Sequence, residues 1–284
     1  MKLSSILVAN RAEIAIRVAR ACGDLGLRTA MIYSQDDTES LHRRIGDASH
    51  ALTGYGPSAY LDGDAVIEAA RLNDCDAIHP GYGFLSERAD FARQCEAAGL
   101  TFIGPSAEHL ALFGDKTRAR AAALKAKVPV TPGIDHSVSL EEAKAFFRSL
   151  EANGQAMIIK AKAGGGGRGT RVVQRLAELE AAYARCRSEA NLAFGVDEVY
   201  VESFLKRARH IEVQVLGDRN GDITHLGERE CSVQRRFQKL VEIAPAPALN
   251  ESLRRQIFDA AMRLAKSAQY TNLGTFEFLV DTST

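Results

Sequence analysis

The sequence lacks an excess of charge of either sign. Its 284 residues contain 36 Lys and Arg against 36 Asp and Glu, so the formal net charge is zero with histidine neutral. A protein without a global positive field does not attract nucleic acid or an anionic membrane by its total charge. We therefore expect neither nucleic acid nor a membrane as a partner, and any anion must be bound at a local site.

Long apolar runs and paired cysteines are also missing. The N-terminal apolar run, residues 6–9, is too short for the core of a signal peptide, and no stretch reaches the ~20 apolar residues of a membrane span. The five cysteines are odd in number and scattered, and no C-x-x-C pair occurs, which argues against a disulfide framework and against a zinc site. These absences favour a cytoplasmic protein.

The first hundred residues alternate short apolar runs with helical periodicity, the pattern of a parallel sheet covered by helices. We expect strands over residues 6–9, 28–34, 77–78 and 101–103, and helices over residues 14–25, 40–46, 64–72 and 87–98. The turn after the first strand reads Asn-Arg-Ala-Glu instead of the G-x-G-x-x-G of a dinucleotide site. The pattern predicts an α/β domain without NAD.

Two prolines and a glycine within residues 128–133 mark a break in the chain, and we place the domain boundary at residue 114. Beyond the break the pattern changes to hairpins, and Asn220-Gly221 is a strong turn signal. Strands are expected over residues 157–161, 170–173, 199–205, 210–216, 223–226 and 275–280, and helices over residues 141–151, 176–189 and 252–268. Residues 1–114 are thus predicted as the parallel α/β domain and residues 115–284 as a mixed α+β domain.

The most informative local feature is a run of four glycines, Gly164 to Gly167, between two predicted strands. Consecutive glycines expose backbone N–H groups to phosphate oxygens, and Lys160, Lys162 and Arg168 add positive charge. The pattern predicts a cationic lid over a polyphosphate, although a flexible hairpin tip would explain the loop alone. It is not a Walker loop, which needs G-x-x-x-x-G-K-[ST] between a strand and a helix.

Several motifs resemble, in order and spacing, the biotin carboxylases of the ATP-grasp superfamily. They are residues 6–15 (ILVANRAEIA), 79–87 (HPGYGFLSE), 102–105 (FIGP), 114–116 (GDK), the glycine run, 228–236 (ERECSVQRR) and 275–278 (TFEF). The likeness extends from about residue 3 to the last residue. It implies a Rossmann-like N-terminal domain, then an incomplete ATP-grasp domain with a lid around residues 131–203. The implied activity is carboxylation of biotin with ATP, bicarbonate and Mg²⁺ or Mn²⁺.

The resemblance also implies roles for single residues. Lys116 and Lys160 are similar to the lysines on the ATP phosphates, and Gly166 and Gly167 to the lid's backbone contacts. Lys239 resembles the lysine beside bicarbonate and the transferred phosphoryl group, which makes it the implied catalytic residue. The other implied positions are Glu202, Ser203, Phe204 and Leu205 at the adenine edge, His210 and Gln234 near ribose and phosphates, and Glu277 as a metal ligand.

Each of these residues taken alone also has an ordinary structural explanation. Lys116 and Lys239 could be solvated surface lysines, because lysine is mostly exposed. Glu277 alternates with apolar neighbours, as in any half-exposed strand. Cys231 could be a nucleophile, but no motif pairs it with a base, which favours a buried thiol.

Some positions depart from the family that the motifs resemble. Phe237 stands where relatives commonly have histidine, and Lys162 and Thr170 replace small and apolar residues of the lid. The chain also stops before the family's second metal-binding Glu, its Asn and its catalytic Arg. We therefore expect a truncated chain that binds nucleotide weakly or not at all and does not carboxylate biotin alone.

For the complete protein, the resemblance implies three kinds of partner: a biotin carboxyl carrier domain or protein, a carboxyltransferase, and a second copy bound through the N-terminal domain. No biotin-carrier Ala-Met-Lys-Met motif is present. The final carboxyl acceptor, whether pyruvate, acetyl-CoA or another acyl-CoA, stays open. Two alternatives to a biotin carboxylase also stay open: another ATP-grasp ligase such as the carbamoyl-phosphate synthetase large chain, and a non-catalytic nucleotide-binding or docking module.

Overall fold

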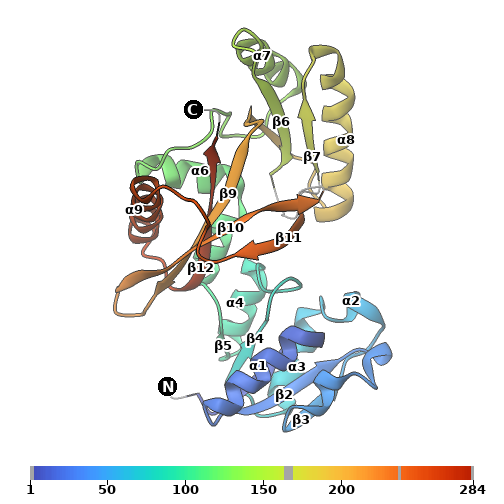
Figure 1. The fold of residues 1–284 in the computed structure, drawn as a ribbon. Helices are drawn as coiled ribbons and strands as arrows, with labels where there is room; N and C mark the ends of the chain where they lie inside the picture. Colours follow the sequence, from blue (N-terminus) through green and yellow to red (C-terminus); the bar gives the residue numbers. More distant parts are fainter. Residues whose placement is uncertain (1–2, 163–168, 236–237, 283–284) are drawn as a thin grey trace. The chain divides into compact units, whose positions relative to one another are not determined.

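Two units, Met1–Ala111 and Leu112–Thr284, make up the chain in a computed structural model (Figure 1). The structure describes residues 3–162, 169–235 and 238–282. Each unit buries hydrophobic clusters formed by its own residues, as a folding unit must. None of the described helices is both long enough and apolar enough to cross a membrane.

The first unit is built on a five-stranded parallel sheet with the order β3-β2-β1-β4-β5. Its strands are β1 (Ser5–Val8), β2 (Arg28–Tyr33), β3 (Ala48–Ala51), β4 (Ala77–His79) and β5 (Thr101–Phe102). Its helices are α1 (Ala12–Asp24), α2 (Gly56–Ala59), α3 (Gly63–Leu72) and α4 (Ala89–Ala97), with 3₁₀ turns at Gln35–Asp37 and Leu41–Arg44. The α/β prediction is confirmed, but β3 and α2 were not predicted, and where a helix was expected over residues 40–46 only the 3₁₀ turn Leu41–Arg44 forms.

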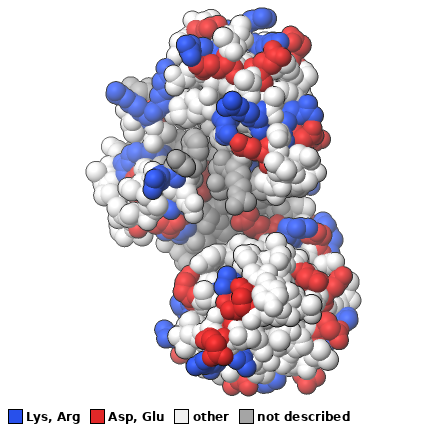
Figure 2. Space-filling model, turned by 90° about the vertical axis from the view of Figure 1, so that its right-hand side faces the viewer, with Lys and Arg blue, Asp and Glu red and all other residues white. Residues whose placement is uncertain are grey.

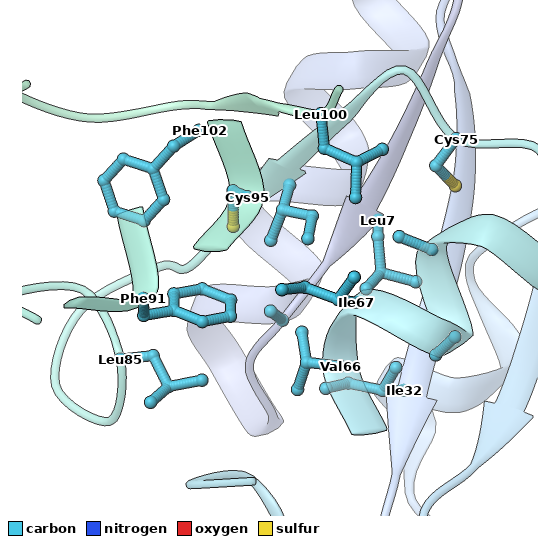
Figure 3. Packing of buried hydrophobic residues seen from close by; sticks show 14 of the residues in the cluster. Leu7, Ile32, Val66, Ile67, Cys75, Leu85, Phe91, Cys95, Leu100 and Phe102 are labelled. Atoms are coloured by element: carbon cyan, nitrogen blue, oxygen red, sulfur yellow. The ribbon is translucent and has the colours of Figure 1, made fainter. Parts of the chain in front are cut away.

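Strand alternation explains how helices cover both faces of this sheet. Leu7 of β1 belongs to the cluster that includes Val66 and Ile67 of α3 and Phe91 of α4, as Figure 3 shows. Its neighbours in β1 point the other way, into the cluster formed with α1. Phe91 meets Phe102 edge to face, with ring centroids 6.1 Å apart. A fully buried side chain of this size contributes roughly 1.5–3 kcal/mol.

The second unit contains two antiparallel sheets. The small sheet has the order β7-β6-β8, with β6 (Ala156–Ala161), β7 (Thr170–Val173) and β8 (Val199–Phe204). The large sheet has the order β11-β10-β9-β12, with β9 (Ala208–Gly217), β10 (Ile223–Arg235), β11 (Gln238–Ile243) and β12 (Asn272–Asp281). The α+β prediction is confirmed, although β11 was not predicted.

Helices support one face of each sheet in this unit. α7 (Leu140–Glu151) and α8 (Leu176–Phe194) pack on the small sheet, and α9 (Glu251–Ser267) packs on the large one. α5 (Ala107–Gly114) precedes α6 (Lys116–Lys125), which joins α9 and β12 through a shared apolar cluster. On the face that Figure 2 shows, basic and acidic side chains are interspersed in small groups.

The predicted turn between β9 and β10 forms at the Asn-Gly pair. Gly221 has φ +94°, a conformation that L side chains rarely adopt. Asp218 stabilises the turn, because its carboxylate accepts hydrogen bonds from the backbone N–H groups of Asn220 and Asp222, at 2.8 and 2.9 Å. The turn sets the pairing of β9 with β10, and with it the positions of the polar residues on both strands.

Candidate functional site

A first cluster of polar residues lies on the face of the small sheet that faces away from α7 and α8. Val199 and Val201 of β8 pack into the core beneath those helices, so the alternating residues Tyr200 and Glu202 point to the opposite face. Lys160 of β6 pairs with Tyr200 across the strands, and its Nζ donates to Glu202 Oε2 at 2.9 Å. Two residues predicted to bind nucleotide thus contact each other directly.

Glu202 is a buried carboxylate with several hydrogen-bond donors. It is 6% exposed and also accepts from Thr131 Oγ1 at 3.1 Å and from Arg120 Nη1 at 3.3 Å. Burial alone would raise the pKa of Glu202, but Lys160, Tyr200 and Arg120 more than offset it and hold that pKa below its usual value. Glu202 is therefore ionised at neutral pH.

A segment beside β8, residues 131–138, forms backbone contacts with the residues predicted at the adenine edge. The Ser203 backbone N–H donates to Pro132 O at 2.7 Å. Gly133 bridges to Glu202, and a Cβ at Gly133 would lie 2.8 Å from the Val201 carbonyl oxygen, so any other residue would displace the backbone. Ser203 is buried, whereas Phe204 and the following Leu205 are half-buried.

Lys116 is the first residue of α6 and lies near the end of β6. Its Nζ donates to the Ala161 carbonyl oxygen at 3.3 Å, so Lys116 and Lys160 lie at the same end of that strand. Asp115 caps the helix by accepting from the backbone N–H of Thr117 at 2.9 Å. Lys162 makes ion pairs with Glu198 at 2.9 Å and with Asp115 at 3.8 Å.

Part of the predicted lid lies outside the described residues. Gly166 and Gly167 belong to residues 163–168, and Phe237 to residues 236–237, none of which the structure describes. Two other departures from the family pattern are described. Thr170 begins β7 and pairs with Lys160, and Lys162 forms ion pairs with Glu198 and Asp115.

A second cluster lies on the large sheet, on the face opposite α9. Phe276 and Phe278 of β12 pack toward α9, and Glu277 between them pairs with Glu212 of β9 across the strands. Lys239 of β11 links the two carboxylates: its Nζ donates to Glu277 Oε1 at 2.7 Å and also to Glu212. The predicted catalytic lysine and the predicted metal ligand are therefore direct neighbours.

His210 and Gln234 complete this second cluster. Gln234 Nε2 lies 2.7 Å from His210 Nδ1, and the other ring nitrogen, Nε2, faces Glu277. The distance from His210 Nε2 to Glu277 Oε1 is 3.5 Å. The four residues to which the resemblance assigned roles here, Lys239, His210, Gln234 and Glu277, thus lie together in the structure.

The charges of the second cluster stabilise one another. Hydrogen bonds from His210 and Lys239 lower the pKa of Glu277 to about 2. Burial opposes the charge of Lys239, but Glu212 and Glu277 outweigh it and raise the pKa of that lysine. Glu212 is 2% exposed, and Arg229 donates to its Oε1 from Nε at 2.9 Å and from Nη2 at 2.6 Å. Because its pKa is raised, Lys239 is a cation at neutral pH.

Sequence reasoning missed three charged members of these clusters: Glu212, Arg229 and Arg120. A signal existed for two of them. Glu212 is two residues from His210 on a strand, so both point to one face, and Arg120 is four residues from Lys116 on a helix, so both lie on one side. Arg229 belonged to a recognised motif but had no assigned role.

The second cluster also contains groups that could hold a cation. Within the described part of the chain, ligand atoms of His210, Glu212 and Glu277 lie within 4.8 Å of one another. Two carboxylates suit Mg²⁺, which prefers oxygen, better than the histidine nitrogen does. Glu212, Cys231 and Glu242 form a second such group. Burial raises the pKa of the Cys231 thiol to about 12, so that thiol is not an activated nucleophile.

Two family descriptions match the chain. Residues 2–110 match the biotin carboxylase N-terminal domain, and residues 115–284 match the ATP binding domain of the carbamoyl-phosphate synthase L chain. The first match covers the parallel sheet of the first unit, and the second covers both clusters of polar residues.

Curated relatives are identical at about half of the positions. Pyruvate carboxylase of Bacillus subtilis is 53% identical over 281 residues, which are 98% of this chain and 24% of that protein. The mitochondrial pyruvate carboxylase of Homo sapiens is 52% identical over 282 residues, again 98% and 24%. The chain thus spans about a quarter of the length of these relatives.

Solved structures share the fold over nearly the whole chain. A biotin carboxylase from Campylobacter jejuni, in complex with β,γ-ATP, has a TM-score of 0.95 at 44% identity and covers 99% of this chain and 63% of that one. The biotin carboxylase domain dimer of Hydrogenobacter thermophilus 2-oxoglutarate carboxylase, in complex with MgADP, ADP and bicarbonate, also has a TM-score of 0.95. It is 41% identical and covers 99% of this chain and 62% of that one.

Proposed function

Because this chain belongs to the biotin carboxylase family, we propose that it supplies the ATP-binding part of an enzyme that carboxylates biotin with ATP and bicarbonate. The observation that carries the proposal is the pair of domain matches. The ATP-binding match over residues 115–284 would suit a carbamoyl-phosphate synthase equally well. The match of residues 2–110 to the biotin carboxylase N-terminal domain favours biotin as the acceptor.

In this proposal the first cluster binds the nucleotide. Lys116 and Lys160, at one end of β6, contact the ATP phosphates, and Gly166 and Gly167 add backbone N–H groups. The residues Glu202, Ser203, Phe204 and Leu205 read the adenine edge. Cations are needed there because phosphoryl transfer develops charge on the equatorial oxygens, and fixed positive groups stabilise that charge.

The second cluster carries the chemistry. A bicarbonate oxygen attacks the γ-phosphorus of ATP and the β-phosphate oxygen leaves, which gives carboxyphosphate and ADP. The C–O bond to phosphate then breaks as the carboxyl group passes to a ureido nitrogen of biotin, and the released phosphate takes up the proton of that N–H. Lys239, whose pKa is raised by Glu212 and Glu277, stays cationic beside the anionic reactants. His210 and Gln234 contact the ribose and phosphates.

Magnesium or manganese fits the residues of the second cluster. Glu277 would hold the ion, and the Glu212 carboxylate has an oxygen within 4.8 Å of the Glu277 ligand atom. A bound divalent cation neutralises phosphate charge. Lys239, which donates to Glu277 at 2.7 Å, orients that carboxylate before a ligand arrives.

The partners follow from the same proposal. A biotin carboxyl carrier domain or protein would present biotin, a carboxyltransferase would consume the carboxybiotin, and a second copy would bind through the N-terminal domain. Relatives named pyruvate carboxylase and a neighbour described as a domain dimer support this assembly. All five cysteines are free and buried, which supports a reducing compartment such as the cytoplasm.

The test is bicarbonate-dependent ADP formation by the full-length protein, measured with and without free biotin. We expect biotin to stimulate ADP formation and Lys239→Gln to abolish the stimulation. ADP formation that needs ammonia or glutamine and ignores biotin would support a carbamoyl-phosphate synthetase instead. Nucleotide binding without turnover under any of these conditions would support a non-catalytic module.

A further inference from the structure

Arg120 of α6 is a nearly buried arginine to which the proposed reaction gives no role. It is 9% exposed and lies one turn after Lys116. Its Nε donates to Asp135 Oδ1 at 2.7 Å, and its Nη2 donates to the Thr131 carbonyl oxygen at 2.8 Å. Its Nη1 reaches Thr131 Oγ1 at 3.2 Å and Glu202 Oε1 at 3.3 Å. Asp135 and Thr131 therefore hold the guanidinium in place beside Glu202.

Glu202 is shared between two cations that differ in exposure. Lys160 Nζ contacts Oε2 at 2.9 Å from a side chain that is 25% exposed, whereas Arg120 contacts Oε1 from a side chain that is 10% exposed. The charged and titratable groups facing Glu202 are thus Arg120 from α6, Lys160 from β6 and Tyr200 from β8. Asp135, of the segment beside β8, faces Arg120.

Lys160 can change partner, because the proposed function brings it into contact with the ATP phosphates. When Lys160 turns to the ATP phosphates, Glu202 loses a hydrogen-bonded cation but stays in its buried position. A buried carboxylate whose charge is not balanced by a nearby cation costs free energy. Such a carboxylate would either retain Lys160 or take up a proton. An arginine held by other groups removes that cost, because a guanidinium is charged at every physiological pH and donates from several nitrogens at once.

We propose that Arg120 is a positioning residue that frees Lys160 for the nucleotide, by keeping Glu202 compensated after Lys160 has moved to the phosphates. Arg120 thereby sets the affinity for ATP without touching it. The inference rests on the proposed function, because it assumes that Lys160 binds phosphate.

The main test is Arg120→Gln in the full-length protein, with MgADP as the probe and isothermal titration calorimetry as the measurement. Titrations at pH 7 in two buffers of different ionisation enthalpy give both the Kd and the number of protons exchanged. We expect the Kd to rise roughly 5- to 150-fold, the usual range for coupling between sites. We also expect up to one proton to be taken up on binding, which the wild type does not take up, because Glu202 then becomes protonated.

Two further variants separate compensation of charge from a structural role. Arg120→Lys keeps a cation facing Glu202 and is expected to bind MgADP without the extra proton, even if its stability falls. In Arg120→Gln/Glu202→Gln no carboxylate needs a cation, so the double variant should bind MgADP as Glu202→Gln alone does. A matched control is Arg254→Gln, which removes a cation from another buried carboxylate, Glu228, at 2.9 Å, and should change neither the Kd nor the proton count.

These measurements distinguish charge compensation by Arg120 from a purely structural role. Extra proton uptake in Arg120→Gln, absent from Arg120→Lys, supports the proposal. An unchanged Kd and proton count in Arg120→Gln overturn it, and so does a lowered melting temperature without nucleotide-linked proton uptake. If Arg120→Gln does not fold, Arg120→Lys decides, since extra proton uptake by that variant contradicts charge compensation and its absence supports it. A wild-type protein that does not bind MgADP overturns the proposed function itself, which is a different result.

Discussion

The two clusters of the second unit pair lysine with glutamate in opposite settings. On the small sheet, Lys160 meets Glu202, a carboxylate that is 6% exposed and has a second cation fixed beside it. On the large sheet, Lys239 meets Glu277, whose side chain is 53% exposed, as well as the buried Glu212. The first arrangement is a closed contact between sheet, helix α6 and the segment beside β8. The second is an open row of charges across a sheet face.

This difference indicates that the two clusters have different functions. In the closed contact Arg120 stays beside Glu202 when Lys160 turns to the phosphates, so the groups around Glu202 keep their positions and can hold nucleotide in one place. An open row of opposite charges can exchange partners, because each group keeps at least one other neighbour: Glu212 keeps Arg229, and Glu277 keeps His210. We therefore expect the small sheet to determine affinity and the large sheet to determine rate.

The largest expected effect is on the rate, from Lys239→Gln. Loss of this cation should lower kcat for bicarbonate-dependent ADP formation by about 10²- to 10³-fold, as loss of one charge-stabilising donor does in other enzymes, while the Kd of MgATP changes little. Steady-state kinetics and calorimetry on the full-length protein measure the two quantities. The control is Lys144→Gln, which removes a lysine paired with Glu141 on α7. An unchanged kcat in a folded Lys239→Gln protein would exclude Lys239 from the chemistry.

Lys160→Met should have the opposite signature, a loss of affinity. Hydrogen bonds to charged groups contribute about 1.5–3 kcal/mol, so the Kd of MgATP should rise about 10- to 150-fold. Calorimetric titration measures the change, and the exposed Lys125→Met at the end of α6 is the control. If Lys160→Met lowered kcat and left the Kd unchanged, the division of work between the two sheets would be wrong.

Local sequence pattern predicted the strands that carry Lys160, Glu202 and Glu277, but not β11, which carries Lys239. Phe276-Glu277-Phe278 alternates in the structure as the sequence indicates, with both rings toward the core and the carboxylate outward. The Asn220-Gly221 turn forms where it was predicted, between β9 and β10. These features depend on neighbours in sequence, which is why a single sequence contains them.

Contacts between strands that are distant in sequence could not be predicted from local pattern. The register that sets Glu277 opposite Glu212 joins residues from separate elements, and β11, which carries Lys239, is mostly exposed and lacks a regular apolar alternation. The role of Arg120 beside Glu202 depends on residues 131–135 running along β8, which no periodicity reveals. The family resemblance supplied Lys239 and Glu277 but not Glu212 or Arg120.

A smaller effect is expected from Gly133→Ala, on the stability of the closed cluster. The new Cβ would lie 2.8 Å from the Val201 carbonyl oxygen and 3.1 Å from Arg120 Nη2. Displacing that backbone should cost about 1–3 kcal/mol and weaken MgATP binding along with it. Urea denaturation measures the cost, and Gly23→Ala, whose Cβ would meet nothing within 4 Å, is the control. Equal stability of the two variants would show that the segment beside β8 adapts easily.

The smallest expected effect is a pH dependence at the helix that supports the small sheet. Glu142, in the first turn of α7, accepts hydrogen bonds from Ser139 and His136, which lower its pKa to about 2. Because the folded pKa lies below the ordinary value of 4.5, this contribution to stability is complete above about pH 4.5 and is lost as the pH falls toward 2. Melting temperatures between pH 7 and pH 3 should therefore fall less steeply for Glu142→Gln than for the wild type. Parallel curves would mean that the cap persists in the unfolded chain, since only a pKa that differs between the two states produces a slope.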